Sequence, residues 1–182
     1  MILPIYVYGA PVLKKNAEEI DPAYPELQTF IADMFETMAH SEGIGLAAPQ
    51  AGKSIRLFVL DASVFADDKP ELANYKKVFI NPVILERAGE KIRYNEGCLS
   101  FPKLHEDVYR EPRVRVEYYD ENFEKHDEWF DGVVARIIQH EYDHLDGKLF
   151  IERLSPLRRK LIASKLKRIS KGDFSASYKT KL

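Results

Sequence analysis

The stretch Gln139-His140-Glu141-Tyr142-Asp143-His144-Leu145-Asp146-Gly147 contains the pattern His-Glu-x-x-His, and the whole chain can be interpreted around it. On an α-helix, residues four positions apart share a face, so His140 and His144 can bind one metal ion together. Glu141 lies beside them and can reach a water molecule on that metal. The pattern also arises by chance, and the alternative interpretation is a surface helix that carries two polar histidines.

The residues around the motif predict a helix with its histidines turned toward the protein interior. Asp131 is a plausible N-cap and Gly147 a plausible end. At helical spacing, Val133 and Ile137 fall on the same face as the three motif side chains, and further apolar residues widen that face. The opposite face carries Ala135, Arg136, Gln139, Asp143 and Asp146. A buried glutamate between two histidines needs polar partners, which a metal and its water provide.

A third ligand has to come from elsewhere in the chain, because a catalytic metal site generally has three protein ligands and one open position. The extended motif of one metalloprotease class would place that ligand at Phe150, which cannot bind a metal. Another class takes a glutamate from the following helix, but residues 160–172 contain no acid. The remaining candidates are Cys98, Glu96 and the isolated histidines His40, His105 and His126. Cys98 follows a glycine in a turn-like segment and would complete a Cys-His-His site.

Composition predicts one ordinary globular domain over residues 1–182. The chain is 45% hydrophobic and 31% charged, and its net charge of -2 argues against a protein that coats nucleic acid. No apolar run approaches the roughly 20 residues that a membrane span needs, and the first residues lack the pattern of a signal peptide. The single cysteine cannot form an internal disulfide, so the expected compartment is the cytoplasm.

Upstream of the motif, periodicity predicts one helix and several strands. The helix runs from about residue 25 to 40 and is followed by the small-residue stretch Gly43–Gly52. That stretch is interpreted as a connector, with a backbone wall for a ligand as the alternative. The pair Asn81-Pro82 suggests an edge strand or a bulge. Strands are expected at residues 55–60, 78–85, 91–94, 108–109, 113–119 and 126–130.

Downstream, Ser155-Pro156 begins a second helix, with a serine N-cap and a proline in the first turn. Its expected apolar stripe is Leu157, Leu161, Ile162, Leu166 and Ile169. Residues 155–182 contain nine Lys or Arg and one acid, Asp173. A solvated helix face with a frayed tail explains this charge, and the alternative is contact with an anionic partner such as ribosomal RNA.

Three motifs taken together resemble the signature motifs of peptide deformylase, in the same order. They are Gly43-Ile-Gly-Leu-Ala-Ala-Pro-Gln50, Glu96-Gly-Cys-Leu-Ser100 and Gln139-His-Glu-Tyr-Asp-His-Leu-Asp-Gly147. The resemblance implies an α+β fold with a central metal-binding helix packed among antiparallel β-strands, an N-terminal helix and a C-terminal helix. It also implies a hydrolase that removes the formyl group from the N-terminal formylmethionine of new polypeptides.

By this resemblance, Cys98, His140 and His144 hold one divalent metal ion, with Fe²⁺ expected in the cell. Zn²⁺, Ni²⁺ or Co²⁺ can occupy the same ligands. Glu141 accepts the proton of the water that attacks the formyl carbon and passes it to the departing amine. The oxyanion is then stabilised by the backbone N–H of Leu99 and the side-chain amide of Gln50.

The resemblance further implies that the formylmethionyl peptide lies extended against the backbones of Ile44-Gly45 and Gly97. Helix geometry adds Val133 and Ile137 as expected walls of a methionine-sized pocket. The basic segment 155–182 is a candidate contact with the ribosome, and the oligomeric state is left open.

Three rival interpretations stay open from the residues alone. One is a metallopeptidase with an unusual cysteine ligand. Another is a closed structural zinc site, for which Glu96 is the only candidate fourth ligand near Cys98. The third is an RNA-binding module that uses the basic C-terminal segment.

Overall fold

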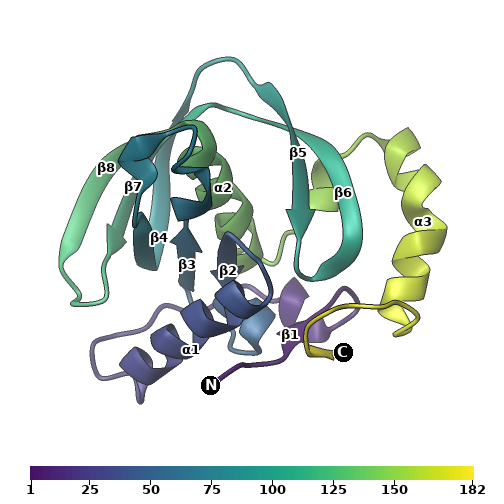
Figure 1. Cartoon of the computed structure of the whole chain (residues 1–182), viewed down its shortest axis with the longest axis horizontal. Coiled ribbons are helices and arrows are strands. Elements are labelled where there is room, and N and C mark those ends of the chain that lie inside the picture. Colours follow the sequence, from purple (N-terminus) through teal and green to yellow (C-terminus); the bar gives the residue numbers. More distant parts are fainter.

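The structure is a computed structural model that describes all residues from Met1 to Leu182. Its helices are α1 (Leu27–His40), α2 (Gly132–Leu145) and α3 (Pro156–Ser170). Antiparallel sheets surround α2, and α1 and α3 lie outside them (Figure 1). The α+β fold with a central helix is therefore confirmed. None of the helices is long and apolar enough to cross a membrane.

The larger sheet has five antiparallel strands in the order β2-β3-β4-β7-β8. Their bounds are Gly45–Ala47, Leu57–Asp61, Lys76–Ala88, Arg113–Tyr119 and Lys125–Asp131. Alternation in β7 puts Val114, Val116 and Tyr118 into the core, as its sequence predicts. β4 is an interior strand, so Pro82 marks no sheet edge. It falls where the β4–β7 register shifts, which is the predicted bulge.

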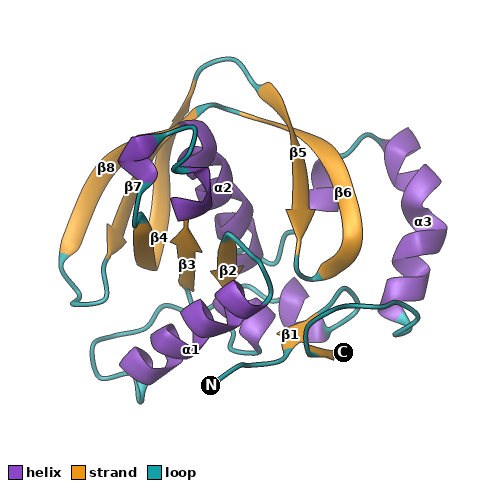
Figure 2. Ribbon diagram, viewed as in Figure 1, coloured by secondary structure: helices purple, strands orange, loops and turns teal.

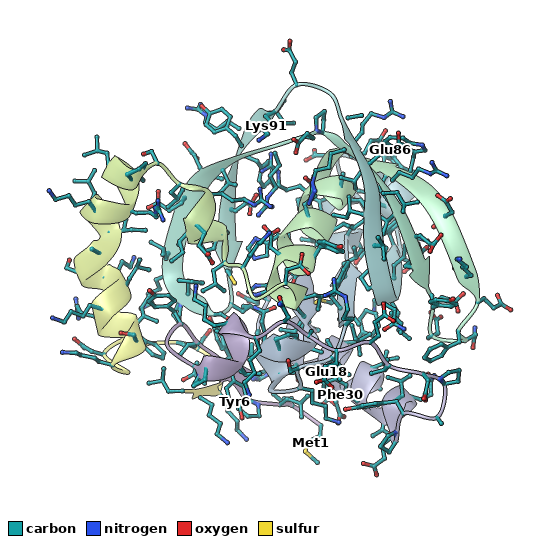
Figure 3. All side chains as sticks on the ribbon, turned by 180° about the vertical axis from the view of Figure 1, so that it is seen from behind. Met1, Tyr6, Glu18, Phe30, Glu86 and Lys91 are labelled. Carbon is teal, nitrogen blue, oxygen red and sulfur yellow. The ribbon has the colours of Figure 1, made fainter.

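A second, two-stranded sheet pairs β5 (Ile92–Cys98) with β6 (Phe101–Arg110). Both strands are longer than predicted. Some of their buried positions carry charged residues, Glu96, Glu106 and Arg110, where the sequence pattern of a strand calls for apolar ones. Glu86 and Lys91 lie on the two sides of the turn that joins β4 to β5, at the top of Figure 3. Figure 2 shows strands on both sides of α2, which places this helix between the two sheets.

A third pairing was not predicted. β1 (Ile5–Tyr6) and β9 (Thr180–Lys181) pair in parallel, so the first and last strands of the fold lie side by side. Strands of two residues leave no periodic signal in a sequence.

The motif helix α2 is buried on all sides, which corrects the expectation of a polar outer face. Ala135, Arg136, Gln139 and Asp143 are all buried, although helical spacing puts them opposite the histidines. The reason is tertiary, since α2 packs on strands of the five-stranded sheet and bonds from Arg136 and His140 join it to β5 and β6 on the other side. Asp131 occupies the N-cap position without a side-chain hydrogen bond, and Gly147 follows the helix with φ of +67°.

Two further expectations need correction. Residues 43–52 are not a loose connector, because they contain β2 and a 3-10 turn at Ala48–Ala51. In α3, only Ile162, Leu166 and Ile169 of the expected stripe are buried. Leu157 and Leu161 are 70% and 65% exposed, because α3 touches the rest of the molecule along a narrow line.

Candidate active site

Three side chains of metal-ligand type meet between the two sheets. Cys98 ends β5, while His140 and His144 lie one turn apart on α2. One ligand atom from each residue lies within 4.8 Å of the others, and Cys98 Sγ is 3.4 Å from His144 Nε2. The β5–β6 register shifts between Gly97 and Cys98, next to the tight turn that leads into β6. A thiolate and two imidazoles form a donor set that suits a divalent transition metal.

Glu96 orients His140. Its Oε1 accepts a hydrogen bond from His140 Nδ1 at 2.8 Å, which leaves the Nε2 atom of that ring for a metal. Both carboxylate oxygens of Glu96 are also bonded to Arg110, and Arg136 reaches one of them. Glu96 therefore has no oxygen available as a fourth ligand, which argues against a closed structural site.

A buried ion network supports this carboxylate. Arg110 is fully buried and bridges Glu96 to Asp143. Arg153, in the 3-10 turn Phe150–Arg153 that precedes α3, binds the same Asp143. Burial alone would raise the pKa of Glu96, but its hydrogen bonds to His140 and Arg110 hold that pKa well below its usual range. No local pattern marks Arg110 or Arg153 as part of a site, because their partners are distant along the chain.

The two histidines have opposite proton preferences. Burial lowers the pKa of His144 to about 3, so its ring is neutral. Burial also disfavours charge on His140, but hydrogen bonds to Cys98 and Glu96 raise its pKa well above the usual range. A metal ion would take the place of that proton, since a metal binds the neutral imidazole.

Glu141 lies next to the cluster and is buried at 5% exposure. Burial raises its pKa to about 7, and its Oε2 atom has no hydrogen-bond partner in the protein. A Cβ atom at Gly45 would lie only 2.5 Å from Glu141 Oε1, so β2 passes directly over this carboxylate. A buried carboxyl group with a pKa near neutrality and a free oxygen can exchange a proton with a water molecule.

A cavity of about 490 Å³ opens beside the cluster. It is lined by most of the residues predicted for the site: Ile44, Gly45, Gln50, Gly97, Cys98, Leu99, Ile137, His140 and Glu141. His144 and Val133 do not line it. Val133 instead packs against the core cluster under the five-stranded sheet. Among the alternative ligands, His105 lines the cavity from β6, but none of His40, His105 and His126 joins the cluster with Cys98.

Two hydrogen-bond donors lie near Cys98. The side-chain amide of Gln50 donates to Ser100 Oγ at 3.1 Å and lies 3.5 Å from Cys98 Sγ. The side-chain oxygen of Gln50, Oε1, accepts a hydrogen bond from the backbone N–H of Ala47, which fixes the orientation of the side-chain amide. The backbone N–H of Leu99 makes no hydrogen bond within the protein. The free N–H of Leu99 can therefore serve a charged oxygen that forms in the cavity, and so can the Gln50 amide hydrogen whose present contact is the long one to Cys98 Sγ.

The walls of the cavity are edges of sheets. β2 is the outermost strand of the five-stranded sheet, and β5 lies at an edge of the two-stranded sheet. Sequence reasoning missed Ser177 and Tyr178, which also line the cavity from the end of the chain. Nothing local to these two residues marks them as part of a site.

Comparison with known proteins gives one consistent family. A family model described as polypeptide deformylase matches residues 2–160. The peptide deformylase of Christiangramia forsetii is 52% identical over 186 residues, covering 98% of this chain and 95% of the relative. That of Cytophaga hutchinsonii is 50% identical over 181 residues, covering 100% of this chain and 97% of the relative.

Solved structures agree with the sequence comparison. The crystal structure of peptide deformylase from Thermus thermophilus matches with a TM-score of 0.84 at 41% identity, covering 94% of this chain and 99% of that chain. A peptide deformylase from Plasmodium falciparum matches with a TM-score of 0.83 at 38% identity, covering 92% and 95%. Similarity thus extends over nearly the whole length of both partners.

Proposed function

The chain belongs to the peptide deformylase family, and we propose that Cys98, His140 and His144 hold the metal ion of its reaction. The enzyme is a metal-dependent hydrolase that removes the formyl group from the N-terminal formylmethionine of new polypeptides and releases formate. The observation that supports the ligand assignment is the meeting of these three side chains beside a cavity.

The proposed metal is Fe²⁺, with Zn²⁺, Ni²⁺ and Co²⁺ as ions that fit the same donors. When bound, the metal supplies a Lewis acid that makes water a nucleophile near neutral pH. Support for an open site comes from Glu96, whose oxygens are engaged by His140 and two arginines.

Glu141 is the proposed proton carrier. Its pKa of about 7 allows it to accept a proton from the attacking water and to return that proton to the departing amine. Its free Oε2 atom supports this role, because no protein donor competes for the oxygen.

Leu99 and Gln50 are the proposed oxyanion donors. The unpaired N–H of Leu99 directly follows Cys98 in the chain, the oriented amide of Gln50 lies 3.5 Å from Cys98 Sγ, and both residues line the cavity. Both are fixed by the fold before substrate binds, so they stabilise the charge without further reorganisation.

The substrate is proposed to bind as an extended strand between two edges. Ile44 and Gly45 present the edge of β2, and Gly97 presents the edge of β5. Ile137 lies on the wall of the same cavity and is the proposed contact of the methionine side chain. Val133 does not line the cavity but packs against the core cluster that contains Ile137, which favours an indirect role for Val133.

We also infer one catalytic domain over residues 1–182, working in the cytoplasm where formylated chains are made.

The exposed, basic α3 is a proposed ribosome contact, supported by its unpartnered Leu157 and Leu161. Replacing Arg159 and Lys160 by glutamate should weaken sedimentation with ribosomes and leave peptide deformylation unchanged. Unchanged sedimentation would contradict this contact.

An anaerobic metal analysis combined with a formate-release assay tests the proposed function. The protein should release formate from formyl-Met peptides and leave internal peptide bonds intact, which separates it from a metallopeptidase. Cys98→Ala should lose both the stoichiometric metal and the activity. A Cys98→Ala variant with normal metal content and turnover would refute the ligand assignment.

A further inference from the structure

The C-terminal tail, residues 171–182, returns across the molecule to the active site. After α3 the chain passes back beneath β6 and ends beside β1 (Figure 1). The tail is bonded to β1 at both ends of β9, through Ile5 N to Lys179 O and Val7 N to Lys181 O, each at 2.9 Å. Its half-buried residues alternate with exposed ones, as in a strand: Phe174, Ala176, Tyr178 and Thr180.

This tail touches the cavity directly. Ser177 and Tyr178 line it, and the Tyr178 hydroxyl donates a hydrogen bond of 2.7 Å to the carbonyl oxygen of Leu99. Lys103 Nζ donates to Ser175 Oγ, which fastens the tail to β6. The family model ends at residue 160, so the tail residues that make these contacts lie outside the part of the chain that it matches.

The tail also reaches the second oxyanion donor, through β1. The hydroxyl of Ser100 donates to the carbonyl oxygen of Tyr6 at 2.6 Å and accepts from the amide of Gln50 at 3.1 Å. Tyr6 lies near the lower edge of the molecule in Figure 3. Because Tyr6 is part of β1, the β1–β9 pairing stabilises the strand on which this chain of bonds ends.

We propose that the C-terminal tail is a positioning element of the active site, and that Tyr178 is a positioning residue that holds Leu99 in its productive orientation. The inference rests on the proposed role of the Leu99 N–H. Leu99 lies in the turn between β5 and β6, and its N–H is unpaired. The hydroxyl of Tyr178 is the polar group that restrains its carbonyl. Without that restraint the turn samples orientations in which the N–H is not aligned with the developing oxyanion.

Steady-state kinetics with a formyl-Met peptide test the proposal on the metal-loaded enzyme. Tyr178→Phe removes only the hydroxyl, and it should lower kcat about three- to tenfold, the rate equivalent of one neutral hydrogen bond. KM should stay within about twofold, because the oxyanion forms after the substrate is bound. Tyr109→Phe is the matched control, since Tyr109 is 57% exposed and does not line the cavity. An unchanged kcat in Tyr178→Phe, with or without a change in KM, overturns the proposal.

A second measurement is independent of turnover. In the zinc-loaded protein, the ¹⁵N order parameter of the Leu99 amide should fall in Tyr178→Phe and stay unchanged in Tyr109→Phe. An unchanged order parameter overturns the positioning role even where kcat falls. If the wild-type protein releases no formate, the proposed function fails, whereas the order parameter still decides whether Tyr178 restrains Leu99.

Discussion

Glu141 is the residue whose environment is most closely matched to its proposed task. It is buried, one of its oxygens is unpaired, and its pKa is raised to about 7. Glu141→Gln keeps the shape of the side chain and removes the proton carrier. This change should lower kcat by about 100- to 10,000-fold. Metal content, measured in parallel, should match that of the wild type, and a variant that retains full turnover would contradict the assignment.

Gly45 shows how closely the backbone of β2 approaches this carboxylate. A methyl group there would lie 2.5 Å from Glu141 Oε1, so Gly45→Ala must displace either the carboxylate or the strand. Formate-release kinetics should show a loss of about ten- to a hundredfold, as expected for a catalytic group moved by a fraction of an ångström to about 1 Å.

The contrasting substitution is Gly43→Ala. Its methyl group meets the end of the flexible Leu99 side chain, at 2.8 Å from Cδ1, and that chain end can rotate away. A smaller loss is therefore expected in Gly43→Ala. Equal losses in the two variants would show that close approach to Glu141 is not what requires glycine at residue 45.

At the scale of elements, the contact between α2 and the β5–β6 sheet depends on Arg110. This fully buried guanidinium joins Glu96 on β5 to Asp143 on α2. Arg110→Met removes the one cation that pairs with both carboxylates, leaving Arg136 at Glu96 and Arg153 at Asp143. Because the lost pairs are fully buried, this change should lower the free energy of unfolding by about 3–5 kcal/mol. Urea denaturation measures the change.

Arg115 provides the matched control on the sheet surface. It also bonds two carboxylates, Asp127 and Glu86, but it is 39% exposed. Arg115→Met should therefore leave the denaturation midpoint almost unchanged. Similar midpoints for the Arg110 and Arg115 variants would mean that burial does not set the strength of these ion pairs.

The same buried network predicts how stability depends on pH. The folded-state pKa of Glu96 lies below its unfolded value, because His140 and Arg110 outweigh the effect of burial. Its contribution to stability is therefore complete above the ordinary glutamate pKa of about 4.3, and it is lost as the pH falls toward the lowered pKa. In the metal-free protein, the urea concentration at the denaturation midpoint should decrease as the pH is lowered below about 4.3. The decrease should be less steep in Glu96→Gln. Parallel pH curves for the two proteins would contradict this origin.

Some elements were predictable because their signals are local. The alternating residues Arg113–Tyr119 predicted β7 with the bounds that the structure has. The i, i+4 spacing of His140 and His144 predicted their shared face, and the Ser155-Pro156 pair predicted the start of α3. In each case a few neighbouring residues carry the whole signal.

Other features depend on residues far apart in the chain and were not predictable. Arg110 looks like a surface residue in sequence, and only the packing of β6 against α2 buries it. The β1–β9 pairing joins residues near opposite ends of the chain, and Tyr178 reaches Leu99 only because of that pairing. Helical spacing placed Leu157 in the apolar stripe of α3, but periodicity does not say how wide the contact will be.

For the whole molecule, the three proposed metal ligands connect two sheets. Cys98 belongs to the β5–β6 sheet, and the two histidines belong to the helix that packs on the five-stranded sheet. Removing the metal with a chelator should lower Tm, because a ligand that binds only the folded state stabilises it. Hydrogen exchange should increase more in β5 and β6 than in β3, β4 and β7. A uniform increase would mean that the metal does not selectively stabilise the smaller sheet.

The proposed binding of the substrate to the edges of β2 and β5, which both line the cavity, also bears on when the enzyme can act. A peptide that pairs with both edges must be fully extended and must have its own backbone groups unpaired. A polypeptide whose first residues have already entered a helix or sheet no longer meets that condition. If the substrate binds in the proposed way, deformylation competes in time with the folding of its own substrate. Proteins that bury their N-terminus quickly then leave the shortest time for deformylation.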